Sequence, residues 1–380
     1  RLGTSFEMDQ VVKTLERDHI VVKALEGDEF ECEVPYYRID MGGEADISEE
    51  VIRLLGYSNI EAKIPANGAV KGGYSEAQKN KLAIRRFLRN EGLTEVLTYS
   101  LVDLKKKDAF EYIGHGENYK LLNPLTDEKE YLRKNLLASV LDVASYNYAH
   151  QNKDLGIYEI SDVDAKGLEG RHLAIVLVGN ESIAGKLETR PYDYYSAKGY
   201  LDGIFNLLNL NPSRFRLEKL VSDKEELHPY RSAKILAGKD VIAVIGELHP
   251  NKAKELGFGK SPVVCLELDL AAILDMKSSE KKASIPPRFP TVNRDLAFLV
   301  KKEADFASIK REIMRLDKTI VDVDIFDSYQ GETILKGLKS LAISISLRLE
   351  ERTLKDEETQ VIMDKVIGML KMKFNAEVRS

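Results

Sequence analysis

The chain has 380 residues, of which 31% are charged and 43% hydrophobic, and its formal net charge is −6. These values predict a soluble globular protein of two or three domains. They exclude a membrane-spanning protein, because no apolar run approaches roughly 20 residues, and a protein that coats nucleic acid by bulk attraction. Two isolated cysteines, Cys32 and Cys265, and the lack of a signal peptide predict a cytoplasmic location. The chain begins at Arg1 rather than Met, so we expect a fragment or a partly ordered chain.

Residues 1–70 predict a small α/β unit. Thr4 to Glu7 has the pattern of a capping box for a first helix with an apolar stripe. A hairpin is predicted between Ile20 and Val34, with residues 26–28 in its turn. A second helix is expected to have Asp46 as its N-cap and to end at Gly56, before a flexible linker at residues 65–73.

Acidic residues cluster around the start of that second helix. Asp40 is expected to end the preceding strand, and Gly42-Gly43 would let the chain fold back toward Asp46, Glu49 and Glu50. On the pattern alone, the favoured interpretation is a helix cap with acids near the positive end of the helix dipole. The alternative is a magnesium site, because four carboxylates in one pocket repel each other unless a cation is present.

The middle region, residues 75–274, predicts an α+β domain with a mostly antiparallel sheet. Helices are expected at 76–91, 136–150 and 197–208. Strands are expected at 95–102, 155–160, 173–178, 233–236, 241–246 and 263–268. One long helix, 136–150, is expected to pack on these strands.

The last region, residues 285–380, predicts a strand–helix–strand–strand–helix–strand order. The strands are expected at 294–300, 320–329, 338–349 and 376–379, and the helices at 306–316 and 356–374. This is the order of a split βαβ, ferredoxin-like fold. The region is close to neutral, with 17 Lys or Arg and 16 Asp or Glu residues. Any contact with RNA here is therefore expected to be local.

The third strand of this region has one apolar and one small, polar face. Leu341, Ile343, Ile345 and Leu347 alternate with Ser340, Ala342, Ser344 and Ser346. Because the helices must cover the apolar face, the small residues are left on an open face, beside Ala297, Asp327 and Tyr329 of neighbouring strands. Such a face suits a stacked RNA base, and on the pattern alone it is equally consistent with an ordinary solvated face.

The strand at 320–329 changes character along its length. Val321, Val323 and Ile325 are expected to point inward, and the next residues of the same parity are Asp327 and Tyr329. The inward pattern therefore turns polar where the strand ends.

Several motifs of the last region resemble the anticodon-binding domain of the β chain of bacterial-type phenylalanyl-tRNA synthetase. They are Arg288–Ala297, Phe326–Gly331, Gly337–Leu341 and Glu351–Leu354. The resemblance implies that the wobble base of the tRNA is recognised on the open face by Ala297, Asp327, Tyr329 and Ser340. Tyr329 would stack on the base, and Asp327 and Ser340 would form hydrogen bonds with it.

The first region resembles a winged, DNA-binding-like module of the same family, with flanks at Val34-Pro35 and Gly56–Ile60. The residues that match the spacing of that module's Mg²⁺ ligands are Asp40, Asp46, Glu49 and Glu50. The resemblance implies that all four bind the ion and that Glu44 does not.

The middle region resembles the family's catalytic-like domain, which has a class II synthetase fold. The motifs are Glu95–Ser100, Leu121–Pro124, Leu132–Leu137, Tyr158-Glu159, Leu227–Pro229 and Gly246–Pro250. A class II active site needs an arginine on a strand and a second one opening a Gly-rich helix, because fixed positive charge stabilises the pentavalent phosphate. Tyr158-Glu159-Ile160 lacks the arginine partner, and Gly257–Lys260 runs into a strand. We therefore expect no adenylate chemistry from this region.

The resemblance covers essentially the whole chain and implies that it is the C-terminal half of such a β chain. This half would serve as a scaffold and bind the tRNA anticodon. In that family the α subunit activates phenylalanine with ATP, and editing and N-terminal RNA-binding domains would lie upstream of Arg1. The expected partners are the α subunit and tRNA(Phe), in an (αβ)₂ heterotetramer and away from any membrane, with Mg²⁺ on this segment and ATP on the α subunit. The alternative is a free-standing RNA-binding scaffold without synthetase activity. A large apolar surface on the middle domain, or co-purification with a second chain, would discriminate between the two.

Overall fold

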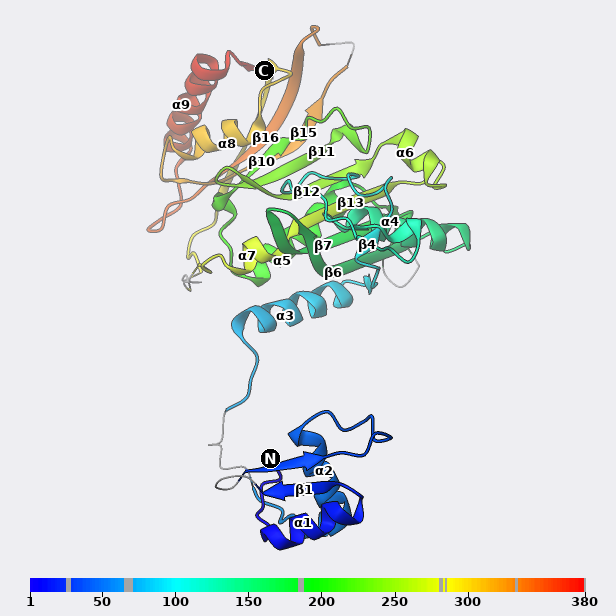
Figure 1. Cartoon of the computed structure of the whole chain (residues 1–380). Helices are drawn as coiled ribbons and strands as arrows, with labels where there is room; N and C mark the ends of the chain where they lie inside the picture. Colours follow the sequence, from blue (N-terminus) through cyan, green and yellow to red (C-terminus); the bar gives the residue numbers. More distant parts are fainter. Residues whose placement is uncertain are drawn as a thin grey trace. The chain divides into compact units, whose positions relative to one another are not determined.

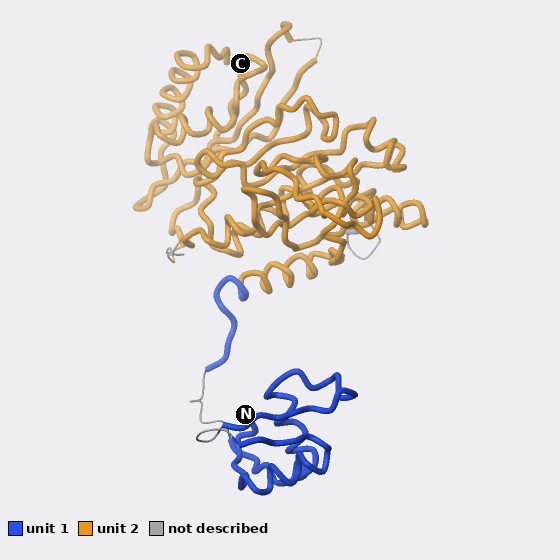
Figure 2. The backbone as a smooth tube through the Cα atoms, viewed as in Figure 1, with its two compact units in different colours: residues 1–79 blue, residues 80–380 orange. Residues whose placement is uncertain are grey.

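The computed structural model describes residues 1–24, 29–64, 71–183, 188–279, 283, 286–331 and 334–378. The chain divides into two compact units, Arg1–Lys79 and Asn80–Ser380 (Figure 2). Among the helices of these residues, none is long and apolar enough to cross a membrane.

The first unit places two helices against a hairpin. Its elements are α1 (Met8–Arg17), β1 (Val21–Ala24), β2 (Phe30–Glu33), α2 (Glu44–Leu55) and the short 3-10 helix η1 (Tyr57–Asn59). Leu15, Ile20 and Val51 form the buried core. The predicted hairpin is confirmed, since β1 and β2 pair in antiparallel register; its turn, residues 26–28, lies outside the described residues.

Three details of the first unit differ from the prediction. Helix α1 begins at Met8, not after Thr4, because Phe6 stays outside the helix and packs against the core. Helix α2 begins at Glu44 with Gly43 as its N-cap, so Asp46 is the third residue of its first turn. Strand β2 ends at Glu33, and Asp40 lies in a turn rather than at a strand end. The helix does end at Gly56, whose φ of 99° suits glycine.

The second unit contains a seven-stranded sheet in the order β10-β11-β12-β13-β7-β6-β3 (Figure 1). All neighbours pair antiparallel except β3 and β6, which confirms the mostly antiparallel prediction. The strands are β3 (Thr94–Glu95), β6 (Leu155–Ala165), β7 (Leu168–Val178), β10 (Phe215–Lys219), β11 (Leu227–Ala237), β12 (Asp240–Leu248) and β13 (Val263–Asp269).

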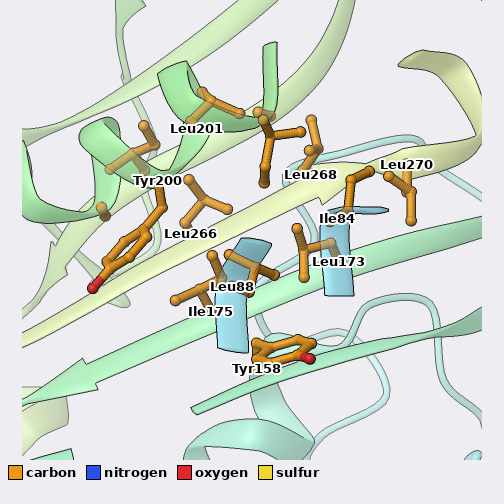
Figure 3. Packing of buried hydrophobic residues seen from close by; sticks show 14 of the residues in the cluster. Ile84, Leu88, Tyr158, Leu173, Ile175, Tyr200, Leu201, Leu266, Leu268 and Leu270 are labelled. Atoms are coloured by element: carbon orange, nitrogen blue, oxygen red, sulfur yellow. The ribbon is translucent and has the colours of Figure 1, made fainter. Parts of the chain in front are cut away.

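Helices cover both faces of this sheet. On one face, α3 (Glu76–Asn90), α5 (Tyr194–Leu207) and α7 (Leu270–Leu274) pack against the strands, as the side chains around Leu173 and Ile175 show (Figure 3). On the other face lies α4 (Leu137–Ala149), with Leu141 packed near Val176. The expectation of one covering helix was therefore incomplete. Residues 173–178 of β7 are all fully buried because both faces are covered.

The predicted strand at 95–102 is broken in the structure. Only Thr94–Glu95 pairs with β6, and Leu101–Val102 forms β4, which pairs with β5 (Tyr131–Leu132). Between them the chain leaves the sheet, because Thr98 donates to the buried carboxylate of Glu159 through its backbone N–H and its hydroxyl. The smaller elements nearby are η2 (Asp127–Lys129), β8 (Asn180–Ile183), β9 (Glu188–Pro191), η3 (Pro212–Arg214) and α6 (Pro250–Glu255).

The last part of the second unit has the predicted ferredoxin-like order. Its elements are β14 (Val292–Lys301), α8 (Phe306–Met314), β15 (Ile320–Tyr329), β16 (Leu338–Leu347), α9 (Asp356–Phe374) and β17 (Glu377–Val378). They form an antiparallel sheet in the order β15-β16-β14-β17. Helices α8 and α9 lie on one side of it and share its core with Leu341, Ile343 and Ile345 (Figure 1).

Candidate nucleic-acid interface and metal site

The four predicted anticodon-binding residues lie on the open face of the four-stranded sheet. Ala297 and Asp327 are both opposite Ala342, and Tyr329 is opposite Ser340. Residues directly opposite each other in antiparallel strands point to the same face. The side chains therefore form two adjacent rows, roughly 7 Å apart, on three neighbouring strands.

A β-bulge in β15 brings Asp327 and Tyr329 to this face. Ile325 is opposite the buried Ile343, but the pairing then skips one residue, so Asp327 is opposite Ala342. The extra residue reverses the parity of the strand. Asp327 and Tyr329 continue the every-second-residue spacing of the inward-facing Val323 and Ile325, yet the bulge turns them to the open face.

One residue of the same strand was predicted wrongly. A second register shift lies between Ile320 and Asp322, and the buried residue there is Ile320, opposite Leu347, rather than Val321. Periodicity alone could not place this shift, because both residues are β-branched and apolar.

The ring of Tyr329 rests on the following turn. Its side chain is 46% exposed, and a Cβ added to Gly331 would lie 2.0 Å from its hydroxyl oxygen. Any side chain at position 331 would therefore displace the ring. Tyr329 both contacts this turn and presents one side on the open face.

The open face carries several carboxylates. Asp295 and Asp324 are both opposite Ser344, in the row next to Ala297, Ala342 and Asp327. Lys310 of α8 is 3.7 Å from Asp324 and 2.9 Å from Asp322. An acidic face repels phosphate groups, so a nucleic acid bound here would contact it through bases rather than through its backbone.

Three of the four predicted metal ligands have other partners within the first unit. The carboxylate of Asp46 accepts hydrogen bonds from the backbone N–H groups of Gly42 and Gly43, each at 2.8 Å. Asp40 forms an ion pair with Arg38 at 2.8 Å. Glu49 is exposed on α2.

Glu50 lies between two arginines in the first unit. Its carboxylate is 2.8 Å from Arg38 and also accepts from Nε of Arg53 at 3.0 Å, while Arg38 reaches Asp18 at the end of α1. Arg53 and then Arg38 hold the pKa of Glu50 below its ordinary value, although burial acts in the opposite direction. Arg38 likewise lowers the pKa of Asp40. No pattern in the sequence indicated this network, because it joins three separate segments.

This arrangement does not fit a divalent cation as it stands. Arg38 occupies the space between Asp40 and Glu50, and the described residues contain no group of three or more His, Cys, Asp or Glu side chains arranged to hold a metal ion. The magnesium site stays a prediction.

Glu159 is paired with an arginine from another segment, although its own strand β6 contains none. Nη2 of Arg133 is 2.9 Å from Oε1 of Glu159, and Nη1 donates to the hydroxyl of Thr98 at 2.6 Å. Arg133 follows β5 in the chain and reaches β6 from outside that strand. Its side chain is only 2% exposed, so it is committed to Glu159 rather than open to a phosphate.

Family models of known proteins match three segments of the chain. Residues 60–270 match the model of the phenylalanyl tRNA synthetase beta chain CLM domain, residues 287–379 the ferredoxin-fold anticodon binding domain, and residues 1–57 the tRNA synthetase B5 domain.

Curated relatives carry the name phenylalanine–tRNA ligase beta subunit. Those of Listeria monocytogenes and Geobacillus kaustophilus are 35% and 34% identical over all of this chain and 47% of their own length. That of Bacillus subtilis is 33% identical over 91% of this chain and 43% of its own length. The chain thus spans about half the length of the curated relatives it matches.

The fold is therefore that of a tRNA synthetase chain with a ferredoxin-like anticodon-binding domain at its end. More specifically, the chain belongs to the phenylalanyl-tRNA synthetase β-chain family.

Proposed function

We propose that this chain is a segment of the β subunit of a phenylalanine–tRNA ligase, which joins phenylalanine to tRNA(Phe) with ATP. The segment would have three domains: the metal module at 1–70, the catalytic-like class II domain at 75–274 and the anticodon-binding domain at 285–380. It would support an ATP-binding α subunit in a cytoplasmic (αβ)₂ complex. The names of the relatives and the succession of matched domains support this proposal.

We propose that Ala297, Asp327, Tyr329 and Ser340 bind an anticodon base. One observation carries the proposal: the bulge in β15 turns Asp327 and Tyr329 to the same open face as Ala297 and Ser340. Tyr329 offers an aromatic ring for stacking, Asp327 an acceptor and Ser340 a hydroxyl. Small residues between them leave room for a flat ring.

Substitution of Tyr329 in the complete α/β complex tests this proposal. Stacking of a base on an aromatic ring contributes about 1–3 kcal/mol, so Tyr329→Ala should weaken tRNA(Phe) binding roughly ten- to a hundredfold. Tyr329→Phe keeps the ring and should remain close to wild type. Tyr57→Ala, at another exposed tyrosine, is the matched control.

The competing interpretation is that Tyr329 only packs on the Gly331 turn. In that case Tyr329→Ala would lower the melting temperature of the protein while the Michaelis constant for tRNA stayed unchanged. Phenylalanine activation should be unaffected in every variant, since that chemistry is assigned to the α subunit.

An exposed apolar surface on the middle domain supports a protein partner over the free-standing scaffold. Leu122 and Leu125 are 97% and 98% exposed. Lys129, a few residues further on, lies 3.6 Å from the ring centre of Tyr99, and both Tyr99 and Leu97 are exposed. Contiguous exposed apolar residues mark interaction sites. In native mass measurements, Leu122→Asp plus Leu125→Asp should release the α subunit, and Met372→Asp, at an exposed residue of α9, should not. Retention of the α subunit by the double variant would exclude this surface.

A further inference from the structure

The acidic open face raises the question of where the phosphates of a bound RNA find positive charge. A protein that binds RNA usually neutralises several phosphates with Lys or Arg while other residues contact the bases. The open face presents Asp295, Asp324 and Asp327, and the whole chain has a net charge of −6. The cations that contact the backbone must therefore gather elsewhere.

One cleft of the second unit is lined by several such cations. It measures about 1350 Å³ and lies between the β10–β11 edge of the seven-stranded sheet and helix α8. Its basic lining residues are Arg214, Arg216, Lys219, Arg231, Arg311 and Arg315.

Positive charge exceeds negative charge in this cleft. Among the lining residues that the structure describes, the acids are Glu218, Glu247 and Asp305, half as many as the six basic residues. Glu218 pairs with Arg216 at 2.7 Å and Glu247 with Arg231 at 2.6 Å. Arg311 and Arg315 are exposed on α8, one helical turn apart. A net positive cleft in a negatively charged chain is complementary to a polyanion.

Exposed tyrosines stand beside these cations. Tyr230 is 82% exposed, and Nζ of Lys219 lies 4.8 Å from the centre of its ring. Tyr195 is also exposed and packs edge-on against Tyr194 at 5.5 Å. Aromatic rings within a basic groove are the combination with which proteins bind unpaired nucleotides.

The cleft and the open face lie on the two sides of the four-stranded sheet, and β15 is its edge strand. Helix α8 covers the buried side of the sheet and packs against β15, and Lys310 of α8 reaches Asp322 and Asp324 of that strand. An RNA that contacts both surfaces would pass around this edge, where Lys310 offsets part of the charge of Asp322 and Asp324.

We propose that the cleft binds the phosphate backbone of the same tRNA whose anticodon the open face recognises, with Tyr230 or Tyr195 beside an unpaired base. This inference rests on the proposed function. It adds a second RNA-binding surface that does not discriminate between sequences, because phosphates carry no sequence information.

The salt dependence of tRNA(Phe) binding to the complete α/β complex tests the inference. Each lost phosphate contact lowers the slope of log K against log salt concentration by about 0.7–0.9. Arg311→Gln plus Arg315→Gln should therefore reduce the slope by about 1.4–1.8, and Arg216→Gln plus Arg231→Gln by a similar amount. Arg86→Gln plus Arg89→Gln, two exposed arginines of α3, is the matched control and should leave the slope unchanged.

The outcomes separate this inference from the proposed function. A reduced slope for both cleft variants, with the same preference for the correct anticodon, supports a backbone contact. An unchanged slope in the cleft variants would overturn the inference. If these variants also lost the α subunit in native mass measurements, the cleft would be a protein interface. Failure of the wild-type complex to bind tRNA(Phe), or full binding by Tyr329→Ala, would instead count against the anticodon proposal.

Discussion

Two rows of side chains, each centred on an alanine, differ in what covers them. In the seven-stranded sheet, Ala174 lies between Glu159 and Glu267 on neighbouring strands, underneath α4. In the four-stranded sheet, Ala342 lies between Ala297 and Asp327 on the face without helices. The first row is fully buried and the second is accessible.

The carboxylates of the two rows differ in their burial and in their partners. Glu159 is paired with Arg133, and Glu267 lies 2.7 Å from Nδ1 of His172 and accepts the backbone N–H of Leu136. A buried charge needs such partners because it has lost its hydration. Asp327, in contrast, is exposed to solvent and available to a ligand. An acid in a covered sheet therefore needs partners within the protein, whereas an acid on the open sheet stays accessible to solvent.

Removal of Arg133 should have the largest effect on stability. Arg133→Met leaves the carboxylate of Glu159 buried without its cation, which costs about 3–5 kcal/mol. Chemical unfolding of the full chain measures this loss. The double variant Arg133→Met plus Glu159→Gln should recover part of it, and equal stability of wild type and Arg133→Met would show that the pair is not needed.

Substitution of Arg38 tests the ion-pair network of the first unit in the same way. Arg38→Ala leaves Glu50 with Arg53 alone and frees Asp18 and Asp40, so amide exchange in α1 and α2 should become roughly tenfold faster. The folded-state pKa of Glu50 is below its ordinary value of about 4.5, so its stabilising effect is present above that pH and is lost as pH falls through the folded-state pKa. The variant should flatten this pH dependence.

The same variant bears on the magnesium prediction. If Asp40, Asp46, Glu49 and Glu50 bind Mg²⁺, added Mg²⁺ should slow exchange in α2, and Asp46→Asn plus Glu49→Gln should abolish that effect. If Mg²⁺ leaves exchange in wild type and Arg38→Ala unchanged, the acids serve only as helix caps and ion-pair partners.

A matched pair of alanine substitutions compares the two rows directly. Ala174→Leu overfills a buried site and should cost about 1–3 kcal/mol, whereas Ala342→Leu should change stability by about 0.5 kcal/mol or less. Binding of tRNA(Phe) should show the reverse order, since a leucine at Ala342 would occupy the floor of the proposed base site. Equal losses of stability in both variants would contradict the distinction.

The sequence predicted the architecture of the last domain well, because its signal is local. Alternation from Leu341 to Leu347 identified the covered and open faces, and the polar residues at Asp327 and Tyr329 marked the strand end where the bulge lies. The periodic apolar runs also identified most strands of the middle sheet.

Features that depend on contacts between distant segments were missed. The Arg133–Glu159 pair joins residues on either side of α4, and the Arg38 network joins three segments of the first unit. Neither leaves a periodic pattern. The capping pattern at Thr4 predicted a helix start there, but Phe6 packs against the core and the helix begins at Met8. The pattern at Asp46 predicted an N-cap, but the extended Gly43 takes that position.

The central claim is that the open row recognises an anticodon base, and one thermodynamic cycle tests it most directly. Binding of the α/β complex is measured for wild type and Tyr329→Ala, each with tRNA(Phe) and with the same tRNA lacking the wobble base. If Tyr329 stacks on that base, either change alone should weaken binding roughly ten- to a hundredfold, and the two together should be no worse than one. Losses that simply multiply would show that Tyr329 and the wobble base act independently, and would contradict the account.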